Sequence, residues 1–168
     1  MMTGNASTRA VGTEASGRSE PKSPTPMGGA SVSEVLAGLE AAECGNRELD
    51  ALVEVEARTA EAERSGLARE HWAKWRASAS GLVGDPHTQY PSRPFTTSLD
   101  AALALAERVL PGWGFFLRKD KDGCNCGLVY PEASFVTPGC GSSPTPALAL
   151  CIAILKARQA SNPTAEGV

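Results

Sequence analysis

The sequence predicts an α+β domain in which helices cover a small antiparallel sheet of two or three strands. Three observations lead to this fold class. A hairpin pattern over residues 113–130 lies between two helical patterns, the last helical pattern (146–160) is apolar on nearly every side, and 168 residues suffice for one ordinary core but not for two. Residues 95–160 are therefore the expected α-β-β-α core.

The two ends of the chain are expected to be disordered tails, over residues 1–30 and 161–168. Residues 1–30 consist mainly of Thr, Gly, Ser, Ala and Pro, so they cannot bury enough apolar area to offset their chain entropy. Order is expected to begin at Ser31, because Ser31 and Glu34 have the spacing of a capping box.

A pair of helices is predicted over residues 31–65. The first is expected to stop at Cys44-Gly45, and Asn46 is expected to cap the second. Residues 34–63 carry nine acidic and two basic side chains. We interpret this acidic run as a solvated helix face, with a docking surface for a basic partner as the alternative.

Residues 66–94 are predicted to form a peripheral helix and a linker, with Ser78–Pro94 as the connector because it is rich in Gly, Pro, Ser and Asp. Trp72 and Trp75 are three residues apart and would share one face of a helix. The favoured interpretation is that the two rings anchor this helix to the domain. The functional alternative is a binding surface of Trp72, Trp75 and Arg76 that stacks bases or holds an acidic partner.

The first core helix is expected to start at a capping-box pair, Thr97 and Asp100, and to end at Pro111-Gly112. Strands at 113–118 and 124–130 then flank the hairpin turn signal Asp122-Gly123.

A weak third strand is expected at residues 134–136, followed by a Gly/Pro/Ser loop. Thr145 and Pro146 have the residue types that begin a helix. The helix that follows is apolar all round, so it is expected to lie in the interior.

The five cysteines are an odd number without a secretion signal, which predicts reduced thiols and a cytoplasmic location. The longest apolar run, residues 147–155, is far shorter than the roughly 20 residues that span a bilayer. Membrane association is therefore not expected.

A zinc site is the chemical alternative for Cys124, Cys126 and Cys140, with Cys151 or His87 as the fourth ligand. The Cys-x-Cys pair on a strand points to one face, shared with Leu128 and Tyr130, as small core residues would. We therefore expect buried thiols, no metal and no cofactor, and a redox pair is a further alternative.

Catalysis is not expected. The sequence has no nucleophile elbow, P-loop, dinucleotide-binding glycine motif or zinc-protease motif, and its acids lie mostly on one helix rather than converging. A net charge of -3, from 16 basic and 19 acidic residues, also disfavours general nucleic-acid binding.

Four short segments occur in an order and spacing that resemble a known family: RELD at 47–50, FTTSLDAA at 95–102, LPGW at 110–113 and TPALALC at 145–151. The family is the phage ABA sandwich domain, found in small proteins of phages and prophages. The resemblance implies an alpha/beta/alpha sandwich and a viral or prophage origin, and it implies no reaction. These segments also have plain structural roles in starting and stopping helices, so no catalytic residue is assigned.

The leading hypothesis is a non-enzymatic accessory protein of a phage or prophage that binds a protein partner. The alternative is a protein that binds or sequesters a small ligand, such as a nucleotide signal, in a pocket or between two copies of the chain, and so counters host defence. Assembly into a homo-oligomer stays open at this point.

Overall fold

The computed structural model describes residues 30–85, 87–130 and 139–161. In chain order its elements are α1 (Val32–Ala41), α2 (Arg47–Arg64), α3 (Arg69–Trp72), β1 (Arg76–Ala77), β2 (Leu82–Gly84), β3 (Gln89–Pro91), α4 (Leu99–Val109), β4 (Gly114–Asp120), β5 (Gly123–Val129), β6 (Gly139–Ser143) and α5 (Pro146–Ser161). The predicted tails fall outside these residues, except for Ala30 and for Ser161, which ends α5.

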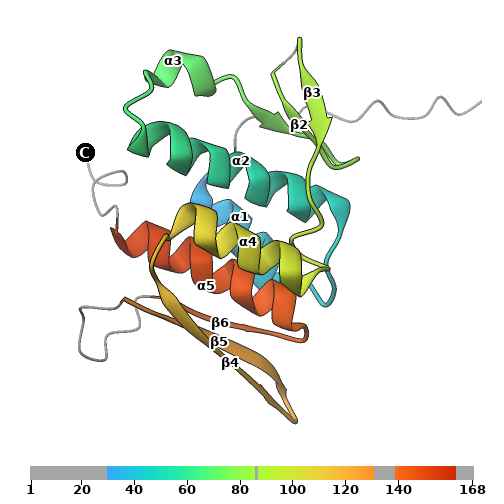
Figure 1. Cartoon of the computed structure of the whole chain (residues 1–168). Helices are drawn as coiled ribbons and strands as arrows, with labels where there is room; N and C mark the ends of the chain where they lie inside the picture. Colours follow the sequence, from blue (N-terminus) through green and yellow to red (C-terminus); the bar gives the residue numbers. More distant parts are fainter. Residues whose placement is uncertain (1–29, 86, 131–138, 162–168) are drawn as a thin grey trace, which may run out of the picture.

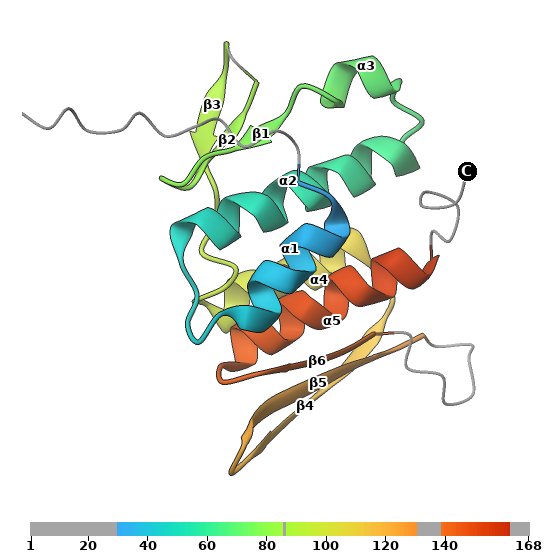
Figure 2. The same ribbon diagram turned by 180° about the vertical axis from the view of Figure 1, so that it is seen from behind.

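The helices lie between two small antiparallel sheets, β1-β2-β3 and β4-β5-β6, so the predicted α+β class is confirmed (Figure 1). Helix α5 contacts β5 and β6 on one side and α1 and α4 on the other, while α2 packs on α1, α4 and the first sheet. The resemblance implied helices on both faces of one sheet. In the described part of the chain all helices instead lie on one face of β4-β5-β6, and α4 covers α5 rather than the sheet (Figures 1 and 2).

The prediction of a plain connector at Ser78–Pro94 was wrong, because this stretch contains β2 and β3 and, with β1, forms the first sheet. The turn between β2 and β3 is held by Asp85, whose Oδ1 accepts hydrogen bonds from the N–H groups of His87 and Thr88, both at 2.8 Å. Strands of two or three residues are too short to show an alternating pattern, which explains why the sequence did not reveal them.

The helix starts follow the sequence closely. The capping box at Ser31 and Glu34 is confirmed, with the Ser31 N–H donating to Glu34 at 2.7 Å and the Glu34 N–H donating to Ser31 at 3.2 Å. The Asn46 side chain caps α2 as predicted, by accepting from the N–H of Leu49 at 2.9 Å.

Two predicted helix boundaries need correction. The cap of α4 is Ser98 and not Thr97, since the Ser98 hydroxyl accepts from the N–H of Ala101 at 3.3 Å while the Thr97 hydroxyl donates to the Pro94 carbonyl in the preceding turn. Helix α1 ends at Ala41, before the predicted stop at Cys44-Gly45.

The third strand of the second sheet is β6, within the stretch predicted to be a loop; the strand predicted at 134–136 lies outside the described residues. Glycine content suggested a loop, but Gly139 and Gly141 have a different role. A Cβ added at Gly141 would collide with the carbonyl oxygen of Ala149, and one added at Gly139 would collide with that of Ala153. These glycines therefore let the backbone of α5 rest directly on β6.

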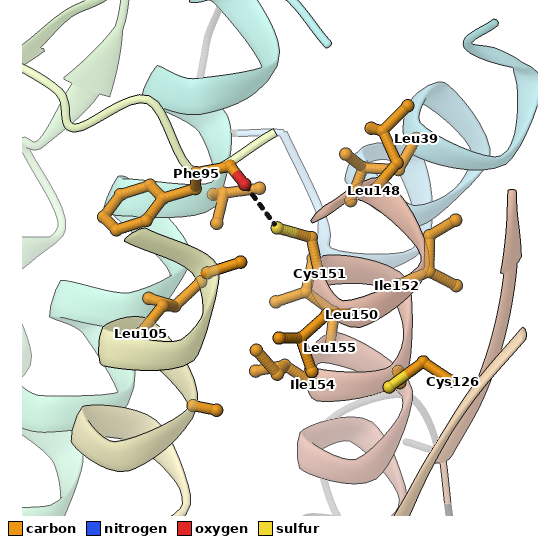
Figure 3. Close-up of a cluster of buried hydrophobic side chains, with 14 of the residues drawn as sticks. Leu39, Phe95, Leu105, Cys126, Leu148, Leu150, Cys151, Ile152, Ile154 and Leu155 are labelled. Carbon is orange, nitrogen blue, oxygen red and sulfur yellow. Dashed lines mark hydrogen bonds between the residues drawn. The ribbon is translucent and has the colours of Figure 1, made fainter. Parts of the chain in front are cut away.

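Helix α5 is the centre of the core, as its all-round apolar character predicted, and its Thr145 cap is confirmed by a hydrogen bond of 3.4 Å from the N–H of Leu148. Its side chains meet those of α1 and α4 on one side and Cys126 of β5 on the other (Figure 3). Largely buried residues of this core include Leu39, Phe95, Leu105, Leu128, Leu148, Leu150, Ile152, Ile154 and Leu155. No helix among the described residues combines the length and apolar character needed to cross a bilayer.

Replacing Gly141 by Val tests the contact between α5 and β6. The added side chain would overlap the Ala149 carbonyl, so we expect the free energy of unfolding to fall by about 2 kcal/mol or more, in the range of overpacked cores. Ser142→Ala, on the exposed face of the same strand, should change it by less than about 0.5 kcal/mol. Equal denaturant midpoints for the two variants would show that this contact is not tight.

Candidate functional site

The most exposed apolar surface in the described part of the chain lies on β4. Phe115, Phe116 and Leu117 are consecutive, and their exposed fractions are 49%, 50% and 38%. We call these three side chains the β4 surface. Every residue of β4 is exposed, whereas Cys124, Cys126 and Leu128 of the neighbouring β5 are buried.

The position of α5 explains why the β4 surface is uncovered. Helix α5 rests on β6 and β5 and makes few contacts with β4, which is the edge strand of the order β4-β5-β6. Figures 1 and 2 show β4 at the margin of the molecule, away from the helices. Phe115 pairs with Leu128 and Leu117 with Cys126, so Phe115 and Leu117 share the helix-facing side of the sheet but lie beyond the reach of α5.

Phe116 lies on the opposite, outward face of the sheet. It pairs with Gly127, and a Cβ added at Gly127 would overlap the far edge of the Phe116 ring, so the ring extends over this glycine. An aromatic ring over a cross-strand glycine replaces the contacts that a glycine cannot make. The sequence analysis missed the β4 surface. The predicted turn at Asp122-Gly123 would pair Phe116 with Val129, but the turn residues are Lys121 and Asp122, which shifts the register so that Phe116 pairs with Gly127.

In the candidate surface of Trp72, Trp75 and Arg76 the two tryptophans are partly buried and Arg76 is exposed. Helix α3 ends at Trp72, so the prediction that both rings share one helix was wrong. The two tryptophans are half-buried in a groove of about 310 Å³ that α2 helps to line. The Trp72 ring N–H donates to the Leu67 carbonyl at 3.3 Å, and the Arg76 guanidinium donates to the carbonyls of Ala73 and Trp75, both at 2.7 Å. These hydrogen bonds are local, so the position of both rings beside α2 is what favours the anchoring interpretation.

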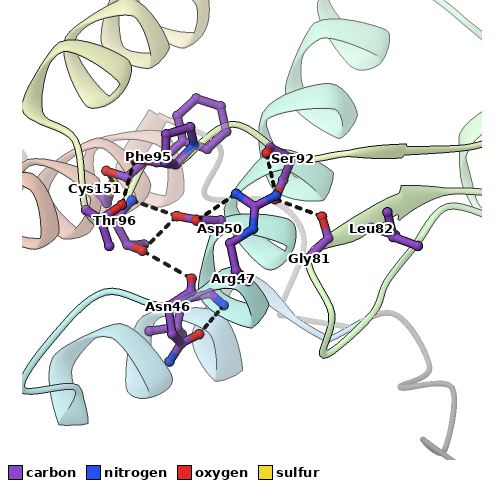
Figure 4. A network of polar contacts seen from close by, with 12 residues as sticks. Asn46, Arg47, Asp50, Gly81, Leu82, Ser92, Phe95, Thr96 and Cys151 are labelled. Atoms are coloured by element: carbon purple, nitrogen blue, oxygen red, sulfur yellow. Dashed lines mark hydrogen bonds and ion pairs between the residues drawn. The ribbon is translucent and has the colours of Figure 1, made fainter.

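The acidic run over residues 34–63 is only in part the solvated face that the sequence predicted, because three of its nine acids are buried on α2. Asp50, Glu54 and Glu56 are buried. Asp50 accepts hydrogen bonds from the backbone N–H of Thr96 at 2.8 Å and from its hydroxyl at 2.7 Å, and it pairs with Arg47 at 3.3 Å (Figure 4).

Four further acids of α2, Glu54, Glu56, Glu61 and Glu63, are also bound by arginines of the same chain. Glu54 pairs with Arg58 at 3.0 Å and with Arg108 of α4 at 3.4 Å. Arg108 also pairs with Glu61 at 2.9 Å, which holds the pKa of Glu61 below its usual value. Charge patterning alone could not reveal this, because Arg108 is far from α2 in sequence.

Arg158 of α5 forms ion pairs with two further acids of α2. It is buried and pairs with Glu56 and Glu63, and its guanidinium also donates to the Glu56 carbonyl at 2.8 Å. Burial raises the pKa of Glu56, although the attraction of Arg158 opposes this. The acidic helix is thus neutralised mainly from within, which leaves little of it to attract a basic partner.

The cysteines follow the prediction only in part. Cys124 and Cys126 are buried on the face of β5 that meets α5, but Cys140 is exposed, because it lies between the two inward-facing glycines of β6 and points outward. Tyr130, expected on the buried face, is 42% exposed and stacks edge-on against Trp113, with ring centroids 5.2 Å apart.

These positions do not form a metal site. Cys140 and the Cys124–Cys126 pair occupy opposite faces of one sheet, Cys151 donates to the Phe95 carbonyl at 3.4 Å (Figure 3), and His87 lies in the turn of the other sheet. Among the described residues no group of three His, Cys, Asp or Glu side chains could hold a metal ion.

A groove of about 470 Å³ lies between α1 and α2, lined by Val35, Leu49 and Leu52 and by two acids, Glu34 and Glu48. No described lysine or arginine lines it. A phosphate group would therefore meet negative charge there, which does not favour a nucleotide ligand.

No known protein family, curated protein or solved structure significantly matches this chain. The resemblance to the phage ABA sandwich domain therefore stays a prediction.

The contribution of the Arg158–Glu56 pair can be measured with Arg158→Met. Removing the guanidinium leaves the Glu56 carboxylate buried without its partner, so the free energy of unfolding should fall by about 3 kcal/mol or more near neutral pH. When the pKa of a carboxyl group is higher in the folded than in the unfolded state, the free energy of unfolding falls as the pH rises from the unfolded-state pKa to the folded-state pKa. The loss should therefore be smaller at about pH 5 than at about pH 8 in denaturant titrations.

The control is the double variant Arg158→Met, Glu56→Gln, which has no carboxyl group to titrate at position 56. We expect it to recover part of the stability and to lose the pH dependence of the difference. A pH-independent loss in the single variant would contradict the burial of the charge.

Alkylation of the folded chain tests the thiol positions. Iodoacetamide at about pH 8 should modify Cys44 and Cys140 and spare Cys124, Cys126 and Cys151, because the last three are buried. Burial also raises the pKa of Cys126 to about 11, which keeps its thiol protonated. Peptide mass spectrometry reads the result, and unfolding in denaturant should make all five reactive. Rapid labelling of Cys126 in the folded chain would contradict the structure.

Proposed function

We propose that this protein is a non-enzymatic binding protein that holds a protein partner at the β4 surface. The observation that carries the proposal is the exposure of three consecutive large apolar side chains on a seven-residue edge strand. Folded proteins usually protect such edges with short strands, prolines, charges or a covering element, since a free edge invites another strand to pair. In β4 the charges are confined to its last three residues, 118–120.

The partner fits the site as an extended segment. A strand laid along β4 pairs its backbone with the free backbone groups of the edge, which supplies affinity. Its alternate side chains then contact Phe116 on the outward face and Phe115 with Leu117 on the helix-facing side, which supplies selectivity.

A non-catalytic role is supported by the state of the acidic groups. Asp50, Glu54, Glu56, Glu61 and Glu63, which could otherwise supply carboxylates for acid–base chemistry, are each paired with an arginine of the same chain. The small-ligand alternative has weaker support, because the groove between α1 and α2 offers acids and not bases. The phage or prophage origin, the role against host defence and the cytoplasmic location stay predictions.

The test uses peptides selected from a library of random linear sequences on the immobilised full chain. A bound peptide should shift the backbone amide signals of residues 114–120 in NMR spectra of the labelled chain. Phe116→Arg should weaken its binding by about tenfold or more, since it removes apolar contact area at the centre of the site.

The matched control is Leu67→Arg, which introduces the same charge at an exposed leucine between α2 and α3. This variant should bind the peptide as the unmodified chain does. The proposed site would be refuted if bound peptides shifted the amide signals of residues around the Trp72 groove instead of those of β4. It would also be refuted if Phe116→Arg left peptide binding unchanged.

A further inference from the structure

This inference rests on the proposed function and specifies the partner of β4. We propose that β4 pairs with β4 of a second copy of this chain, antiparallel and centred on Leu117, so that the two sheets join into one of six strands. The contact is isologous, with the same strand on both sides of a two-fold axis, as in most dimers of identical chains.

The distribution of charge along β4 makes the strand complementary to itself in the antiparallel direction. Its first half is uncharged, Gly114 to Leu117, and its second half is charged, Arg118 to Asp120. Antiparallel pairing over the full strand places Phe116 opposite Arg118 of the second copy, and Phe115 opposite Lys119. Each cation then lies beside an aromatic ring, an arrangement that attracts.

Other pairings of the same strand are less favourable. Parallel pairing in register would place Arg118 beside Arg118 and Lys119 beside Lys119, and like charges directly opposite are destabilising. An antiparallel register shifted to centre on Arg118 has the same fault. A register centred on Phe116 would leave Lys119 and Asp120 without a partner strand. The register centred on Leu117 pairs all seven residues and separates like charges.

The layer above the sheet also fits a second copy. Phe115 and Leu117 lie on the face of the sheet that α5 covers, but α5 lies mainly over β5 and β6. The side chain of Phe115 therefore stays 49% exposed and that of Leu117 38% exposed. A two-fold axis perpendicular to the sheet at Leu117 keeps both α5 helices on the same side. Phe115 and Leu117 of both copies then form one apolar floor between the two helices.

No described element stands in the way of this contact. Figures 1 and 2 agree that β4 is the outermost strand and that the helices lie nearer the other edge of the sheet, at β6. The pairing therefore needs no rearrangement of the described residues.

The test measures the mass of the full chain by light scattering after size exclusion, over about 1 to 500 µM to bracket micromolar dissociation. We expect the mass to rise from 17.4 kDa to twice that value. Leu117→Asp alone and Leu117→Lys alone should each stay monomeric, because position 117 faces itself across the axis. Mixed together they should form a dimer, since an acid and a base then face each other. Leu67→Asp, at another exposed leucine, should dimerise normally.

A second pair of variants covers the case in which a charge at position 117 prevents folding. Phe116→Lys faces Arg118 of the second copy and should raise the dissociation constant at least about tenfold, while Phe116→Glu, facing the same arginine, should dimerise more strongly than Phe116→Lys. Circular dichroism confirms that each variant is folded. A monomer throughout the concentration range, or a dimer that none of these variants weakens, overturns the inference.

The same samples separate this inference from the proposed function. A monomeric chain whose β4 binds selected peptides would refute self-pairing and leave the binding function in place. A chain that neither dimerises nor binds peptides at β4 would refute both.

Discussion

The contact between the backbone of α5 and the backbone of β6 sets the architecture of the second sheet. Because Gly139 and Gly141 have no side chains, α5 lies directly on β6 with Ala149 and Ala153 at the contact. A single helix placed over β6 and β5 does not reach the opposite edge strand, β4. The exposure of β4 is thus a consequence of how tightly α5 is bound at β6, and the apolar residues of β4 stay available to a partner.

A second constraint keeps the helices together on the far side of α5. Two buried acids of α2 are matched by arginines of other helices, Glu54 by Arg108 of α4 and Glu56 by Arg158 of α5. Buried charges are strongly destabilising when a partner is lost, so these pairs fix which faces of the helices meet. They also remove part of the acidic charge of α2 from the surface, which leaves apolar contact at β4 as the better-supported means of binding.

Much of the fold could be predicted from sequence because its signals are local. The caps at Ser31, Asn46 and Thr145, the hairpin and the buried last helix depend on neighbouring residues, and each was found. Some failures are local, such as the short strands β2 and β3 and the cap of α4, but the larger ones come from contacts between distant segments. Glycines of β6 serve as helix contacts rather than loop residues, and the acids of α2 are buried by arginines far away in sequence. The β4 surface was missed for the same reason, since its exposure depends on the packing of α5 over β6 and β5.

Amide hydrogen exchange of β4 as a function of chain concentration tests the central claim most directly, because it reports on the edge strand itself. The account predicts that those backbone amides of residues 114–120 that point away from β5 exchange rapidly in dilute samples and become protected at high concentration, while the amides of the inner strand β5 stay protected throughout. Protection of these outward amides that equals that of β5 in dilute samples, or that does not change with concentration, would contradict it.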